Sequence, residues 1–409
     1  GLPRRVFEIG KKDTRRMRSM FLRMTDSSIV SELKRMGCSP EKIGQVERSC
    51  PSVPLKMSGL STQVASVVAK VASHIGLECI LSDAESAEVS DVLLLGNFTK
   101  YGGLVSRLEM DCSKDICEFS EKMKKLLNQP KVSTRLGDGR ILAYQHLMVM
   151  GIVNVTSDSF YGASCKQGIE AVLQTVGQMV DEGAEIIDLG AESTRPGAIP
   201  LTSALECERL IPAIQMIREK FPEVILSIDT YRAETGAKVI AAGAHMINDV
   251  SGGVDSDMAQ VIYEGKVPII LMHLEANPQE MKPTMRVDQI EQVWQFLEDR
   301  RDRFVSAGVK EDQILLDPGI GFGKSLELNL SLMNRLDELK SLGHPVLLGA
   351  SRKGTIGKVL GGLPTEERLF GTIGVSCQAV VGGAQVIRVH DVRENVQAIR
   401  MLEAVRQWG

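Results

Sequence analysis

The clearest pattern in the chain is a regular alternation of apolar runs and amphipathic stretches that begins near residue 144. The apolar runs are continuous, without polar side chains at every second position, which is typical of parallel strands covered on both faces. They predict strands at His146–Val153, Glu185–Leu189, Val224–Ile228, His245–Ile247, Val267–Met272, Ile314–Leu316, Pro345–Gly349 and Gln385–Val389. Helical periodicity predicts helices that include Gly168–Glu182, Leu201–Lys220, Ala233–Ala242, Gln289–Ala307, Leu326–Leu342 and Glu366–Val381.

Eight strand–helix units over residues 141–409 have the size and number of repeats of a (β/α)8 TIM barrel, an α/β fold. A doubly wound open sheet is the alternative. That fold would place a glycine-rich dinucleotide-binding turn after its first strand, and the segment Gly151-Ile152-Val153-Asn154 is not such a turn. The pattern therefore favours the barrel.

The first part of the chain, residues 1–140, has shorter and more mixed elements that predict a small α/β domain followed by a linker. Predicted strands are Arg5–Ile9, Val53–Met57, Leu77–Leu81 and Val89–Leu95. Predicted helices are Ser27–Met36, Ser61–Ile75, Thr99–Leu108 and Ile116–Leu127, and the linker is Asn128–Gly139. No motif in this part indicates a chemical role.

Composition narrows the class of protein. The chain has 409 residues, 43% of them hydrophobic and 24% charged, as in an ordinary globular protein. A net charge of -4 and an aromatic content of 4% argue against a nucleic-acid partner. No apolar run is long enough to span a bilayer, and the eight cysteines form no CxxC pair. We therefore expect a cytoplasmic protein without a membrane or nucleic-acid partner.

Polar residues follow the predicted strands, at the end where TIM barrels carry their active sites. The carboxylates and amide of Asp229, Asn248 and Asp317 can accept hydrogen bonds from the donor-rich edge of a heterocycle such as a pterin. A second set is cationic or hydroxylic and suits a phosphate or another dense anion: Thr194, Arg195, Lys353, Arg388 and His390. Asn154 can add an oxygen ligand to a Mg²⁺ that bridges such phosphates.

Each residue taken alone also has an ordinary structural interpretation. Asp229 is equally suited to cap a helix, Asn154 to form a turn, and Lys353 to lie in solvent. Phe160 and Phe322 are residues that usually serve packing. Their joint placement at the same end of successive strands is what favours a site.

The motifs NVTxDSF, ESTRPG, SIDT, IND, MH, DPGxGFGK, SRK and RVHD, in this order, resemble those of the dihydropteroate synthase family over about two-thirds of the chain. The resemblance implies a Mg²⁺-dependent condensation of 6-hydroxymethyl-7,8-dihydropterin diphosphate with p-aminobenzoate. It also implies a homodimer and three sets of site residues. The pterin would be held by Asp229, Asn248, Asp317, Lys353 and Arg388; the diphosphate by Asn154, Thr194, Arg195, Arg388 and His390; and the p-aminobenzoate by Phe160, Pro196, Phe322, Ser351 and Lys353.

The first loop departs from the family pattern, because Ser157 replaces a proline and Gly162 stands where the family has a second aspartate. Two alternatives accompany the synthase. One is a methyltetrahydrofolate–corrinoid methyltransferase, which shares the pterin-binding barrel but would not need the anion-binding residues. The other, suggested by the altered first loop, is a pterin-binding protein without turnover.

Overall fold

The computed structural model describes residues 39–41, 43–44, 53–82, 89–111, 113–128, 132–155, 165–191, 201–274 and 289–408. The chain divides into two compact units, with the division between Ser120 and Glu121. The strand predicted at Arg5–Ile9 and the helix predicted at Ser27–Met36 lie outside the described residues.

The first unit contains a three-stranded antiparallel sheet in the order β1-β3-β2. Its strands are β1 (Val53–Ser61), β2 (Glu78–Leu81) and β3 (Val89–Gly96), and its helices are α3 (Thr62–His74) and α4 (Phe98–Leu108). Helix α3 begins where the sequence predicts, because the Ser61 side chain accepts a hydrogen bond from the backbone N–H of Val64. Helix α5 (Lys114–Leu127) crosses the division.

Part of the segment predicted to be a linker is a short hairpin, formed by β4 (Thr134–Arg135) and β5 (Ile141–Leu142). Leu136, in the turn between the two strands, is 1% exposed and packs in a cluster with the barrel-lining Met150 and Ile186. The sequence prediction missed this role, because the turn residues Gly137-Asp138-Gly139 suit a linker as well as a hairpin.

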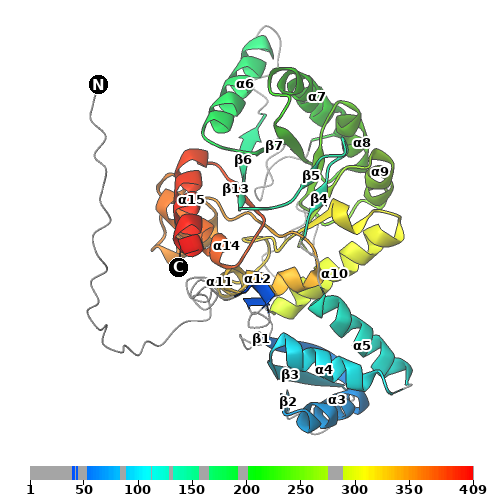
Figure 1. The fold of residues 1–409 in the computed structure, drawn as a ribbon. Helices are drawn as coiled ribbons and strands as arrows, with labels where there is room; N and C mark the ends of the chain where they lie inside the picture. Colours follow the sequence, from blue (N-terminus) through cyan, green and yellow to red (C-terminus); the bar gives the residue numbers. More distant parts are fainter. Residues whose placement is uncertain are drawn as a thin grey trace, which may run out of the picture. The chain divides into compact units, whose positions relative to one another are not determined.

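The second unit is a closed barrel of eight parallel strands, as predicted, with a ring of helices around it (Figure 1). The strands are β6 (Met148–Asn154), β7 (Ile186–Gly190), β8 (Ile225–Asp229), β9 (Met246–Asp249), β10 (Ile269–Met272), β11 (Ile314–Asp317), β12 (Leu347–Leu348) and β13 (Val386–Val389). Their order is β11-β10-β9-β8-β7-β6-β13-β12. A parallel bridge between Leu316 and Val346 closes the ring between β11 and β12.

The helices of the barrel are α6 (Cys165–Asp181), α7 (Ser203–Lys220), α8 (Ala233–Ala241), α9 (Met258–Gly265), α10 (Ile290–Ser306), α11 (Leu326–Asn334), α12 (Leu336–Leu339), α13 (Gly354–Val359), α14 (Leu369–Val381) and α15 (Val392–Trp408). The prediction of a single helix at Leu326–Leu342 is wrong, because α11 ends at Asn334 and α12 begins at Leu336, after an interruption at Arg335. None of the described helices is long and apolar enough to cross a membrane.

Successive strand residues face opposite sides of the barrel wall, and this alternation positions the site. One set faces the helices and forms the large outer core, for example Ile187, Ile228 and Leu316. The other set points into the barrel and forms a smaller core at its lower end, for example Met150, Ile225 and Leu315. Further along the same strands the inward positions become polar, so the upper part of the barrel interior is lined by hydrogen-bonding groups.

Candidate active site

The upper level of the barrel interior holds three of the predicted residues in neighbouring strands. Asn154 is paired in register with Gly190, Gly190 with Asp229, and Asp229 with Asn248. Asn154 and Asp229 are the last residues of their strands, and Asn248 is the last but one of β9, so all three side chains belong to strands and not to the following loops. Gly190, which lies between Asn154 and Asp229, carries no side chain.

Asp317 enters the same interior from β11 and is 4% exposed. Its Oδ1 accepts a hydrogen bond of 2.7 Å from the backbone N–H of Gly319, which fixes the carboxylate. A side chain at Gly349 would meet Asp317 Oδ2 at 3.7 Å and Arg388 Cβ at 3.9 Å, so this glycine leaves room between the two residues. Burial raises the pKa of Asp317, although the charges of Lys353, Lys324 and Arg388 act in the opposite direction.

Arg388 joins two carboxylates inside the barrel. Its Nε donates to Asp188 Oδ2 at 2.6 Å and its Nη2 donates to Asp229 Oδ2 at 2.9 Å. Burial opposes the charge of the guanidinium, but Asp188 and Asp229 raise its pKa above the usual value. The pKa of Asp229 is raised to about 7, chiefly by burial. The positive charge of Arg388 lowers this pKa, but the negative charges of Asp188 and other nearby carboxylates offset that effect.

Lys353 lies in the loop that follows β12. Its Nζ donates to the carbonyl oxygen of Ile320 at 2.7 Å and lies 4.4 Å from the centre of the Phe322 ring. Burial lowers the pKa of Lys353 to about 8, although the negative charge of Asp317 partly compensates. The structure thus brings Lys353 and Phe322, both predicted for the p-aminobenzoate pocket, into contact.

The loop Asp317–Lys324 is held in a conformation that requires its glycines. Gly319, Gly321 and Gly323 have φ values of +66°, +86° and +62°, which side-chain-bearing residues rarely adopt. Lys324 Nζ donates to the carbonyl oxygens of Gly319 at 2.8 Å, Phe322 at 3.1 Å and His273 at 3.2 Å. Lys324 therefore ties this loop together and also to the end of β10.

Ser351 and His390 come from neighbouring strand ends and contact each other. Ser351 Oγ lies 3.0 Å from His390 Nδ1, and it also accepts a hydrogen bond from the backbone N–H of His390 at 3.2 Å. Next to them, Arg352 donates to both carboxylate oxygens of Asp391, at 2.8 and 2.5 Å. The two loops that carry predicted anion-binding residues are thus joined by hydrogen bonds and a two-contact ion pair.

Four predicted residues lie outside the described residues: Phe160, Thr194, Arg195 and Pro196. The altered first-loop positions Ser157 and Gly162 lie outside them as well. Within the part of the chain that the structure describes, no group of three or more His, Cys, Asp or Glu residues is arranged to hold a metal ion. A single oxygen ligand from Asn154 remains compatible with Mg²⁺, which commonly keeps several waters and binds mainly through substrate phosphates.

The structure adds residues that the sequence prediction did not include. Asp188 and Ser227 lie one level deeper, paired in register on β7 and β8, and both are 0% exposed. Asp188 lies within the predicted apolar strand Glu185–Leu189, and an aspartate in such a strand is itself a signal, because a buried carboxylate needs partners. Lys324 was noted in its motif without a role, and no local pattern indicates that it contacts three carbonyl groups.

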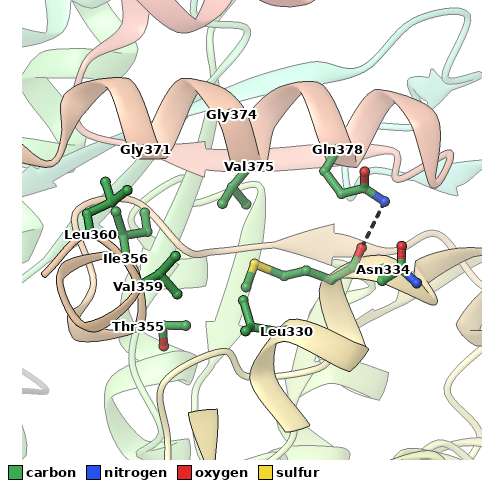
Figure 2. Close-up of a pocket in the computed structure, with 11 residues that line it drawn as sticks. Leu330, Asn334, Thr355, Ile356, Val359, Leu360, Gly371, Gly374, Val375 and Gln378 are labelled. Atoms are coloured by element: carbon green, nitrogen blue, oxygen red, sulfur yellow. Dashed lines mark hydrogen bonds between the residues drawn. The ribbon is translucent and has the colours of Figure 1, made fainter. Parts of the chain in front are cut away.

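A separate apolar groove lies among α11, α13 and α14 (Figure 2). It has a volume of about 390 Å³, and its lining includes Leu330, Met333, Ile356, Val359 and Val375. Among the predicted site residues that the structure describes, none lines this groove.

Comparison with known proteins gives the family of the barrel. The profile of the family described as pterin binding enzyme matches residues 150–390. A dihydropteroate synthase of Synechocystis is 43% identical over 259 residues, which cover 63% of this chain and 89% of that protein.

Two solved structures resemble the barrel. Dihydropteroate synthase of Xanthomonas albilineans with 4-aminobenzoic acid has 37% identity and a TM-score of 0.61, covering 67% of this chain and 99% of that one. The enzyme of Coxiella burnetii in complex with pteroic acid has 35% identity and a TM-score of 0.60, covering 68% of this chain and 100% of that one. The chain therefore belongs to the family of pterin binding enzymes.

Proposed function

We propose that the barrel is a dihydropteroate synthase, a transferase that condenses 6-hydroxymethyl-7,8-dihydropterin diphosphate with p-aminobenzoate to give 7,8-dihydropteroate and diphosphate. The observation that carries the proposal is the convergence of Asp229, Asn248 and Asp317 at the upper end of the barrel, with Arg388 hydrogen-bonded to Asp229. This set of acceptors beside a cation suits a heterocycle that carries an anionic group.

The pterin would lie with its amino and ring N–H groups on the buried carboxylates. Asp317 and Asn248 are 4% and 3% exposed, and hydrogen bonds fix both side chains before a ligand arrives. A carboxylate held in this way accepts two adjacent N–H donors, and because water is excluded the loss of either hydrogen bond is costly. Lys353, whose charge acts on Asp317, would add a donor for the ring carbonyl oxygen.

The diphosphate would be bound by Arg388 and His390, with Thr194 and Arg195 from the second loop. Negative charge grows on the diphosphate as the bond to the exocyclic carbon breaks, so cations that are already in place lower the barrier. Mg²⁺, bound through Asn154 and the phosphate oxygens, would supply further stabilisation of that charge when present. The pairing of Ser351 with His390 holds the imidazole ring in one orientation for this contact.

The p-aminobenzoate would lie between Phe322, Ser351 and Lys353, with Phe160 and Pro196 completing the pocket. The dihydropterin is electron-rich and can stabilise the positive charge on its exocyclic carbon. The arylamine nitrogen then needs chiefly to be placed close to that carbon and in line with the leaving oxygen. The rigid glycine-containing loop that carries Phe322 suits this positioning role.

The proposal is tested with the purified full chain, the pterin diphosphate, p-aminobenzoate and Mg²⁺. Formation of dihydropteroate with equimolar diphosphate is the expected result. Tight pterin binding without product would instead identify a binding protein. Methyl transfer from methyltetrahydrofolate to cobalamin, without dihydropteroate, would identify the corrinoid methyltransferase. Either result would overturn the proposal.

We also propose that the protein acts as a homodimer in the cytoplasm, with the groove among α11, α13 and α14 in the interface (Figure 2). Three apolar side chains on these helices are unusually exposed: Phe370 at 83%, Val359 at 52% and Leu330 at 42%. Burial of such side chains against a second copy is favourable at about 25 cal/mol per Å² of apolar surface. Light scattering of the full chain would give twice the monomer mass, and a monomer mass would refute this part of the proposal.

A further inference from the structure

Asp188 lies in the middle of β7 and points into the barrel, one level below the predicted pterin ligands. Its side chain is 0% exposed, so it does not meet solvent or a ligand in the upper barrel directly. An isolated buried carboxylate is strongly unfavourable, and such groups are found where neighbouring donors and cations satisfy them. The partners of Asp188 therefore indicate its role.

Each carboxylate oxygen of Asp188 is engaged. Oδ1 accepts a hydrogen bond of 2.6 Å from Ser227 Oγ on β8. Oδ2 accepts two, at 2.6 Å from Arg388 Nε on β13 and at 3.1 Å from Asn248 Nδ2 on β9. Two of these three partners, Asn248 and Arg388, belong to the predicted pterin site.

We infer that Asp188 is a positioning residue that fixes the side chains of Arg388 and Asn248 for the pterin diphosphate. The inference rests on the proposed function, since it assigns a role within that site. Asp188 does not touch the substrate; it acts through the two side chains that would.

The shared arginine explains why a second carboxylate is needed. Arg388 contacts Asp188 through Nε and Asp229 through Nη2. A pterin that donates its N–H groups to Asp229 would share this carboxylate with Arg388, which would weaken the contact between the arginine and Asp229. Asp188 keeps the guanidinium in place when this contact weakens. Without the charge on Asp188, Arg388 would pair with Asp229 alone and would compete with the pterin for it.

The test is the substitution Asp188→Asn, which keeps the shape of the side chain and removes its charge. The amide oxygen can still accept from Arg388 and Asn248, and the amide nitrogen can donate to Ser227 Oγ, so the variant is expected to fold. We expect the Kd of the pterin diphosphate, measured by calorimetry without p-aminobenzoate, to rise on the order of tenfold. The KM of p-aminobenzoate should stay at its wild-type value.

A matched control is Glu403→Gln on α15, which removes another partly buried carboxylate that pairs with an arginine. The Glu403 side chain is 18% exposed; its Oε2 accepts from Arg400 Nη1 at 2.9 Å and its Oε1 accepts from the backbone N–H of Leu147 at 2.7 Å, before the start of β6. This variant should lower the melting temperature and leave the pterin diphosphate Kd unchanged. An equal rise of Kd in both variants would show a general effect of lost stability and would overturn the inference.

A double-mutant cycle tests whether Asp188 acts through Arg388. In an Arg388→Lys background the Nε contact is already lost, so Asp188→Asn should change the Kd by less than about threefold. Fully additive effects would contradict the proposed coupling.

Two results remain decisive if a variant behaves unexpectedly. Should Asp188→Asn fail to fold, Ser227→Ala frees one side of the carboxylate and should weaken pterin diphosphate binding by about threefold. Wild-type affinity in that variant would overturn the inference. A wild-type protein that does not bind the pterin diphosphate would refute the proposed function itself, whereas binding that is equal in wild type and Asp188→Asn refutes only the role of Asp188.

Discussion

The substitution Asp317→Asn tests the assignment of the pterin edge most sharply. Asp317 is 4% exposed, and its Oδ1 already accepts the Gly319 N–H at 2.7 Å. Asparagine has the same shape and can keep that hydrogen bond through its own oxygen. The variant therefore changes the charge and places an N–H₂ donor where the wild type has a free acceptor.

The magnitude follows from the hydrogen bonds that are lost. A hydrogen bond to a charged group contributes about 1.5 to 3 kcal/mol, and an aspartate at the pterin edge would accept two. The asparagine amide would place its N–H₂ donor against an N–H donor of the pterin. We therefore expect the binding free energy to weaken by about 3 kcal/mol or more, which raises the Kd at least about a hundredfold. The loss of the Asp317 charge should also lower the pKa of Lys353 further, because that charge now raises it.

The assay is calorimetric titration of each protein with the pterin diphosphate and Mg²⁺ at neutral pH, without p-aminobenzoate. Glu338→Gln is the control, since Glu338 forms a partly exposed ion pair with Arg335 at 2.6 Å on the outer helices. The control should bind as the wild type does. A Kd for Asp317→Asn within about threefold of the wild-type value would refute the reasoning, because no such hydrogen bonds could then be present.

Three further predictions follow from the described residues. The pH profile of kcat/KM should rise as Asp229 loses its proton near pH 7 and fall as Lys353 loses its proton near pH 8, and a flat profile from pH 6 to 9 would contradict these roles. Burial lowers the pKa of His245 in the folded protein to about 4, whereas the same side chain in the unfolded chain binds its proton near pH 6.5. The free energy of unfolding should therefore decrease by about 3 kcal/mol as the pH falls from about 6.5 toward 4. His245→Asn should flatten this acid dependence of the free energy of unfolding in urea titrations, and an unchanged slope would argue against His245 as its source. A truncated chain that begins at residue 129 should keep the wild-type kcat/KM, because four related dihydropteroate synthases match this chain over 89% or more of their own length. A large loss of activity would instead assign a catalytic role to the first unit.

Much of the barrel is predictable from sequence, because each parallel strand is a continuous apolar run between amphipathic helices. The residues at which the strands end are harder to predict from sequence. Asn248 and Asp249 were expected after the fourth strand and are part of β9, where they still pair with β10. A polar side chain inside a barrel satisfies its hydrogen bonds with other strands, so local hydrophobicity does not mark the boundary.

Features that depend on distant contacts could not be predicted. The interruption of the predicted helix at Arg335 keeps Leu336 and Leu339 fully buried, and neither glycine nor proline marks it in the sequence. One partner of Asp188, Arg388, is 200 residues away along the chain. The sequence therefore indicates which residue types gather at the strand ends, whereas the network that orients them is visible only in the structure.

A crystal structure of the full chain with the pterin diphosphate and Mg²⁺ is the most direct test of the central claim. The account predicts the amino and ring N–H groups of the heterocycle on Asp317 and Asp229, Asn248 beside the ring, and the diphosphate on Arg388 and His390. A heterocycle bound outside the barrel mouth, or turned so that its diphosphate faces Asp317, would contradict it.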